Sequence, residues 1–163
     1  MFAIIGIIVA VAVTLLLLVG VLHVGSSGMQ NGKASNAAAE LAEMEVGVQN
    51  LYSAQASFAG LTDTVALDAG TAVVPSNMND GAGGIVNEWG GAVTLAPAAT
   101  STEWTLTETQ VPQGACATLA TKASDALAIT VNGTAITTNP IDIAAITASC
   151  DQSDNELVFT FGH

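Results

Sequence analysis

The residues best suited to covalent chemistry are Cys116 and Cys150, the only two cysteines in the chain. A zinc site would need further ligands, and the two histidines, His23 and His163, lie near opposite ends of the sequence. An even pair of cysteines in an acidic, arginine-free segment is typical of an exported protein in an oxidising compartment. We therefore expect the two to join, which would stabilise the fold by roughly 3 to 4 kcal/mol through loop-closure entropy.

Residues for nucleophilic catalysis are incomplete. Serine and aspartate are plentiful, but no histidine lies between His23 and His163 to act as a nearby base. The glycine-rich run at residues 81–84 lacks the lysine and the serine or threonine of a phosphate-binding loop. The sequence therefore predicts no enzymatic activity and no cofactor.

Two polar motifs near the C terminus have both a functional and a structural interpretation. Asp151, Asp154 and Glu156 are three nearby carboxylates, but their spacing lacks the EF-hand pattern, so a solvated turn between a helix and a strand is favoured over calcium. The tripeptide at residues 132–134, Asn-Gly-Thr, is formally a glycosylation sequon, yet Asn-Gly is also the preferred pair for a tight hairpin turn. We favour the turn.

Single aromatic and titratable residues are similarly ambiguous. Trp89 and Trp104 could bind sugar at a surface, but core packing is favoured in a chain with only 4% aromatic residues. His23 could respond to pH, but its place at the end of an apolar segment favours an interfacial side chain.

The charge is strongly one-sided. There are 2 lysines and arginines against 14 acids, which gives a formal net charge of −12. This charge would repel the phosphates of nucleic acids and anionic lipid headgroups, so no direct nucleic acid binding is expected. The bases are Lys33 and Lys122, and no acid precedes Glu40.

The first part of the chain, residues 1–24, is apolar almost without interruption. As a helix it would be about 36 Å long, enough to cross a hydrocarbon core of about 30 Å. A cleaved signal peptide would have a basic start and a shorter apolar run, and a permanent anchor would have basic flanks. We expect instead a segment whose leader has already been removed and which meets lipid or identical helices. The expected contact residues are Met1, Phe2, Ile4, Ile5, Gly6, Ile7, Ile8, Val11, Leu15, Leu18 and Leu22.

A second helical segment follows a weak point. Glycine and serine disfavour helix, so we expect the helix to loosen at Gly20, Gly25, Ser26, Ser27 and Gly28. Residues 29–55 then regain helical periodicity, with one apolar stripe that should pack on a sheet of the same chain. The stripe consists of Leu41, Met44, Val48, Leu51 and Tyr52. The expected organisation is a segment 1–28, an amphipathic helix 29–55 and a globular head 56–163.

The head reads as an α+β domain. Residues 56–88 are loop-like, rich in proline, asparagine and glycine. Strands of an antiparallel sheet are predicted at 92–95, 104–107, 129–131 and 157–161, with a hairpin turn at 132–133. Pro112 is expected to open a helix that runs to about Leu127, with an apolar stripe at Cys116, Leu119, Ala120 and Ala123.

This organisation, an apolar helix continuing into an amphipathic one and then a sheet with a late cysteine pair, resembles the type IV pilins. Motifs in the head are similar to the PilS-like group of type IVb pilins over roughly residue 40 to the C terminus. They are Leu51-Tyr52, Gly60-Leu61-Thr62, Val74-Pro75-Ser76-Asn77-Met78, Asn87-Glu88-Trp89-Gly90-Gly91-Ala92-Val93-Thr94 and Val111-Pro112-Gln113-Gly114-Ala115-Cys116.

The resemblance implies a life cycle and a set of partners. A prepilin peptidase removes the leader, the subunit waits in inner-membrane lipid, and an ATPase-driven platform assembles identical subunits into an extracellular helical filament. Such filaments serve adhesion, aggregation, secretion-linked colonisation or conjugative mating-pair contact. The family's disulfide carries over onto Cys116 and Cys150, which makes 116–150 the cysteine-bounded region.

One departure and two alternatives accompany this resemblance. Most type IV pilins have glutamate at the fifth mature residue, whereas this chain has Ile5, or Gly6 if Phe2 were first. Either docking relies on packing alone, or the N-terminal segment has diverged toward another assembly scheme. The alternative functions are a minor pilin or pseudopilin of a secretion system, and a membrane-anchored periplasmic binding module.

Overall fold

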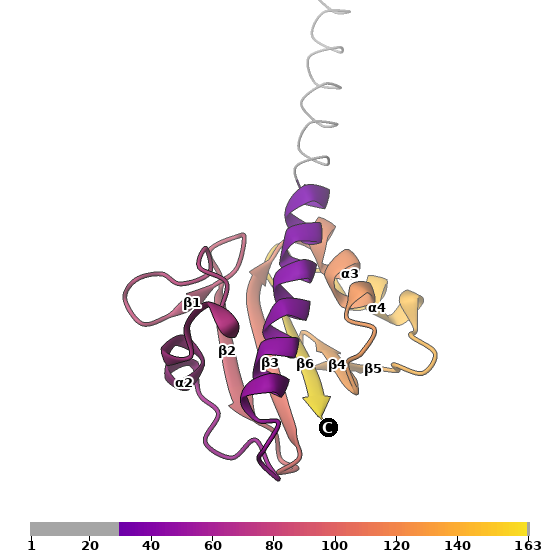
Figure 1. Cartoon of the computed structure of the whole chain (residues 1–163). Coiled ribbons are helices and arrows are strands. Elements are labelled where there is room, and N and C mark those ends of the chain that lie inside the picture. Colours follow the sequence, from indigo (N-terminus) through magenta and orange to yellow (C-terminus); the bar gives the residue numbers. More distant parts are fainter. Residues whose placement is uncertain (1–29, 163) are drawn as a thin grey trace, which may run out of the picture.

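The computed structural model of the chain describes residues 30–162. Its first element is a helix over residues 30–51, which lies across one face of a six-stranded antiparallel sheet (Figure 1). Sheet and helices together form the α+β fold that the sequence predicted. The described elements after that helix are α2 (Asp63–Asp68), a 3-10 helix (Gly70–Ala72), β1 (Ile85–Val86), β2 (Ala92–Pro97), β3 (Glu103–Val111), α3 (Gln113–Lys122), β4 (Ala128–Val131), β5 (Thr134–Ile136), α4 (Ile143–Ser149) and β6 (Asn155–Gly162).

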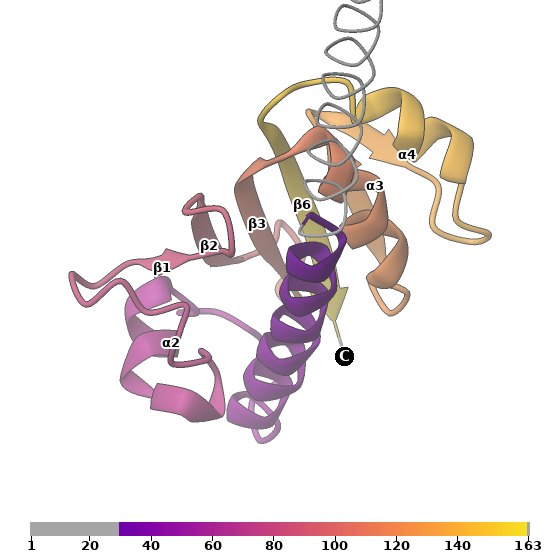
Figure 2. The same cartoon turned by 90° about the horizontal axis from the view of Figure 1, so that it is seen from above.

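Helix 30–51 is held to the head by a regular stripe of buried side chains. Their spacing alternates between three and four positions, so one narrow face of the helix meets the sheet. The buried members are Ala34, Ala37, Leu41, Met44, Val48 and, just past the helix, Tyr52. Figure 2 shows the helix lying against β3 and β6, with α2 on one side and α3 on the other.

The prediction for Leu51 was wrong, because this side chain is 42% exposed. At about 100° per residue, Leu51 and Tyr52 lie on opposite sides of the direction of Val48. The sheet covers the side of Tyr52, which is 8% exposed. At the end of the helix, the buried stripe therefore continues through Tyr52 and not through Leu51.

The strand order is β1-β2-β3-β6-β4-β5, with β3 and β6 at the centre. All four predicted strand segments lie within β2, β3, β4 and β6. Along β3, Trp104 and Leu106 alternate with more exposed residues and face the core, where Leu106 pairs with Phe159 of β6. Alternation with a period of two is what a sheet covered on one face requires.

The predicted hairpin at Asn132-Gly133 is confirmed. The pair connects β4 to β5, with Val131 opposite Thr134. Both turn residues have left-handed backbone angles, φ 50° at Asn132 and φ 78° at Gly133. This conformation is the one that asparagine and glycine tolerate best.

Two parts of the head differ from the sequence prediction. The region 56–88 is not only loop, because it contains α2, the 3-10 helix and β1. Helix α2 begins at the N-cap Thr62, whose Oγ1 accepts a hydrogen bond of 3.2 Å from the main-chain nitrogen of Val65.

The other differences lie around the cysteines. Helix α3 ends at Lys122 rather than at about Leu127, since the main-chain nitrogen of Leu127 donates to the carbonyl oxygen of Thr160 and so already follows the sheet. Helix α4 is capped by Asp142 through the main-chain nitrogen of Ala145, and the sequence prediction gave no bounds for a helix here.

Among residues 30–162, no helix is both long and apolar enough to span a bilayer. The predicted membrane and filament segment 1–24 and the predicted loosening at Gly20, Gly25, Ser26, Ser27 and Gly28 lie outside the described residues.

Candidate functional site

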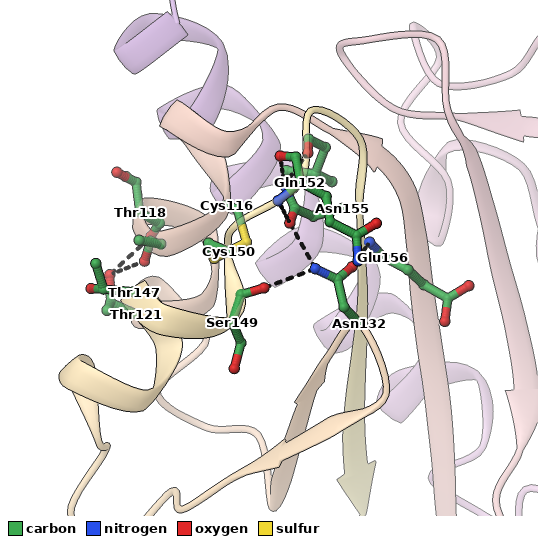
Figure 3. The surroundings of a disulfide bond; sticks show 12 residues. Cys116, Thr118, Thr121, Asn132, Thr147, Ser149, Cys150, Gln152, Asn155 and Glu156 are labelled. Carbon is green, nitrogen blue, oxygen red and sulfur yellow. Dashed lines mark hydrogen bonds between the residues drawn. A yellow bond between two sulfur atoms is a disulfide. The ribbon is translucent and has the colours of Figure 1, made fainter.

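The cysteine-bounded region is built around a disulfide that joins α3 to the end of α4. Cys116 lies in α3, and Cys150 is the C-cap residue of α4. Their sulfur atoms are bonded, the Cα atoms are 5.8 Å apart, and both side chains are buried. The link holds the two helices side by side along one edge of the head (Figures 1 and 3).

A buried asparagine continues this attachment into the sheet. Asn155, the first residue of β6, has no exposed surface. Its Nδ2 donates to the carbonyl oxygens of Val111 and Gln152, each over 2.9 Å. Its Oδ1 accepts a bond of 2.8 Å from Nδ2 of Asn132 (Figure 3). One side chain therefore ties β3, β6 and the β4–β5 turn together.

Asn132 extends the same network to α4. Its Nδ2 also donates to the carbonyl oxygen of Ser149 over 2.8 Å, and its Oδ1 accepts from the main-chain nitrogen of Glu156 over 2.9 Å. The amide nitrogen that a glycan would occupy is thus engaged within the fold. The structure supports the turn rather than the modification at this sequon.

Of the other residues with two interpretations, His23 lies outside the described residues, and the rest have positions in the structure. Trp104 is fully buried, with ring centroids 5.0 Å from Phe161 and 6.2 Å from Phe58, which confirms core packing. Trp89 is half-buried, and its Nε1 donates to Oε1 of Gln30 over 3.3 Å. Asp151, Asp154 and Glu156 are exposed, and within residues 30–162 no three acids, cysteines or histidines are grouped to hold a metal ion.

Two surfaces remain open for contact with other molecules. On helix 30–51, the face opposite the buried stripe exposes small residues and Val46, which is 57% exposed. On the cysteine-bounded region, Ile143 is 62% exposed at the edge of a shallow hollow lined by Thr137, Pro140, Ile141 and Asp142. Neither surface contains catalytic groups.

Sequence reasoning missed two buried acids at the contact between helix 30–51 and the head. Glu108 is 1% exposed and Glu40 is 8% exposed. Glu108 continues the inward alternation of Trp104 and Leu106 along β3, so its burial follows from the period of the strand. Glu40 lies three positions after Ala37 on the buried side of the helix, although its charge had assigned it to the polar face.

The family model described as PilS N terminal matches residues 31–162. The chain belongs to this family of type IVb pilins. The match spans the helix, the whole sheet and both cysteines of the pilin.

Curated relatives agree with this family. The pilin is 32% identical over 105 residues to the "Major structural subunit of bundle-forming pilus" of Escherichia coli O127:H6 (strain E2348/69 / EPEC), and likewise to that of Escherichia coli O111:H-. The aligned part covers 63% of this chain and 53% of each relative. The chain thus spans about half the length of the curated relatives it matches.

A solved pilin has the same fold. TcpA, a type IV pilin from the Vibrio cholerae El Tor biotype, matches with a TM-score of 0.51 over 79% of this chain and 98% of its own, at 14% identity. A helix packed on an antiparallel sheet is therefore shared with a pilin of quite different sequence.

Proposed function

We propose that this pilin is the major structural subunit of a type IVb pilus and polymerises with identical subunits into an extracellular filament. The observation that carries the proposal is that residues 30–52 and residues 1–24 have different surfaces. Between residues 30 and 52, a single stripe holds the head, and the opposite face remains exposed. Residues 1–24, directly upstream, carry no formally charged side chain.

Such a chain suits a polymer. An apolar segment without charge is stable in lipid and equally stable among copies of itself, because lipid tails and apolar side chains offer similar surroundings. The same segment can therefore be stored in the inner membrane and later become the interior of a filament. The names of the curated relatives, major subunits of a bundle-forming pilus, support this function.

The proposed partners follow from this route. A prepilin peptidase would remove a leader, and an ATPase-driven platform would extract the subunit from inner-membrane lipid. Loosening of the helix at Gly20, Gly25, Ser26, Ser27 and Gly28 would allow the filament to bend between its interior and its heads. The net charge of −12 disfavours nucleic acid as a direct partner.

The experiment that tests the proposal is imaging of sheared cell-surface material combined with mass spectrometry. For a major subunit, we expect filaments in negative stain whose main protein band is this chain. A minor pilin would be a trace component of filaments made mostly of another protein. A membrane-anchored binding module would stay with the cells after shearing, and that result would refute the proposal.

A further inference from the structure

Two carboxyl groups from different elements are buried together where helix 30–51 meets the head. Glu40 belongs to the helix, and Glu108 belongs to β3 beneath it. They are 8% and 1% exposed, and the charge of Glu40 acts unfavourably on ionised Glu108. Buried carboxylates are costly unless an opposite charge or several hydrogen bonds compensate them.

The compensation found here is small and uncharged. Nδ2 of Asn77 donates to Oε1 of Glu40, and Nδ2 of Asn87 donates to Oε2 of Glu108 over 3.3 Å. Oε2 of Glu40 is buried and has no hydrogen-bond partner among the described residues.

The charged groups nearby are mostly further acids. Glu88, from the loop before β2, and Glu43, from the same helix, both act unfavourably on ionised Glu40. Neither lysine hydrogen-bonds one of the two buried carboxyl groups. Nζ of Lys33 donates to the main-chain oxygen of Glu88 over 2.8 Å, and Nζ of Lys122 donates to Oγ of Ser35 over 3.4 Å.

A polar hollow lies beside the two amide side chains that bond the cluster. Asn77 and Asn87, the residues that bond the two buried acids, line it together with Met78, Val86 and Glu88, and its volume is about 280 Å³. The hollow therefore brings solvent next to Asn77 and Asn87, the direct hydrogen-bond partners of the two acids.

The protonation of the cluster follows from these surroundings. Burial raises the pKa of Glu108 to about 8, with a smaller lowering by the Asn87 hydrogen bond and a further rise from Glu40. Burial also raises the pKa of Glu40, against the hydrogen bond from Asn77 and with the help of Glu88 and Glu43. Near neutral pH, Glu108 is mainly in the uncharged acid form.

We propose that Glu40 and Glu108 form a proton-binding site that makes the packing of helix 30–51 on the head dependent on pH. With a proton bound, the pair places at most one negative charge in the contact. When the proton leaves, two like charges from the helix and the sheet oppose each other in a buried interface. The helix then separates from the sheet more easily.

The direction of the pH dependence is fixed by linkage. Glu108 has a higher pKa in the folded chain than its ordinary value of 4.5, so the folded state binds more protons. The stabilising effect of the proton is complete below about pH 4.5 and is lost as the pH rises through about 8. Between these limits the folded state binds one more proton than the unfolded state, so the unfolding equilibrium constant rises about tenfold for each unit by which the pH rises.

The test compares the full chain in detergent micelles with its Glu108→Gln variant. Glutamine has the shape of the protonated acid but cannot ionise. We expect the ratio of unfolding constants, wild type over variant, to rise between pH 5 and pH 8 with a slope approaching tenfold per unit. Glu156→Gln, at an exposed position of β6, is the matched control and should follow the wild type. Equal pH profiles for wild type and Glu108→Gln would overturn the proposal.

Hydrogen exchange shows where the proton acts. After correction for the intrinsic effect of pH, protection of amides at residues 41–48 should fall in alkali relative to amides of β6 in the wild type. In Glu108→Gln that relative loss should be absent. If helix and sheet lose protection together, the acids affect the global fold and not the helix–head contact, and the proposed coupling is wrong.

A second measurement applies if Glu108→Gln does not fold. An infrared band of a protonated carboxyl group that persists in the wild-type protein at pH 7 supports the proton site, and the absence of this band refutes it.

Discussion

Gly47 lies so close to the main chain of Val73 that a β-carbon at Gly47 would approach the Cα atom of Val73 to 2.7 Å. The contact joins helix 30–51 to the end of the 3-10 helix. No side chain fits at position 47. Glycine there therefore allows the helix to approach this part of the head closely.

Gly47→Ala should therefore destabilise the head, by about 1–3 kcal/mol, because the neighbour in contact is rigid backbone. Gly32→Ala is the matched control in the same helix, since a β-carbon there meets nothing within 4 Å. That control should be neutral or stabilising by up to about 1 kcal/mol through helix propensity. Urea unfolding of the full chain in detergent measures both. Equal effects of the two changes would mean that the helix is not held against Val73.

Asn155→Ala should be among the most destabilising polar changes in the head. It removes the donor for two carbonyl oxygens and the acceptor for Asn132, and Asn155 itself has no exposed surface. An unpaired buried group costs about 1–3 kcal/mol, but the Gln152 and Asn132 groups are only partly buried and can turn to water, so a total of about 2–4 kcal/mol is expected. Asn36→Ala, on the exposed side of the helix, should change stability by less than about 0.5 kcal/mol. A mild effect of Asn155→Ala would show that water replaces the network.

The disulfide gives a direct chemical prediction. Thiol counting on denatured, non-reduced protein should find no free thiol, because Cys116 and Cys150 are joined. Replacing both by serine should lower the unfolding free energy by about 2–4 kcal/mol. Detection of two free thiols in protein from native filaments would contradict this prediction.

The parts of the fold that were predictable have strong local signals. The stripe from Leu41 to Val48 repeats over two helical turns, and Asn132-Gly133 is a pair whose backbone preference specifies a hairpin turn. Helices α2 and α4 have 6 and 7 residues, too few for an apolar period to stand out from the surrounding turns.

The burial of Glu40 and the exposure of Leu51 depend on which residues of the head contact the helix. Charge suggested that Glu40 faces water and hydrophobicity suggested that Leu51 faces the core, and the structure reverses both. The rotation of the helix about its axis determines which side chains face the sheet. A stripe pattern in the sequence cannot distinguish two rotations that differ by one residue position. The hydrogen-bond partner of Glu40, Asn77, is distant in the sequence and is brought to Glu40 only by the tertiary fold.

The central claim, assembly through the apolar N-terminal segment, is tested most directly at Ile5. If residues 1–24 pack among identical segments in a dry filament interior, Ile5→Asp places an acid in apolar surroundings and should abolish or severely reduce filaments. Ile5→Leu, which keeps volume and polarity, and Asp154→Ala, at an exposed position of the head, should leave filament yield nearly unchanged. The measurement is the amount of this chain in sheared filaments, normalised to its total cellular level. A normal yield for Ile5→Asp would contradict the account, because position 5 would then not lie in an apolar filament interior.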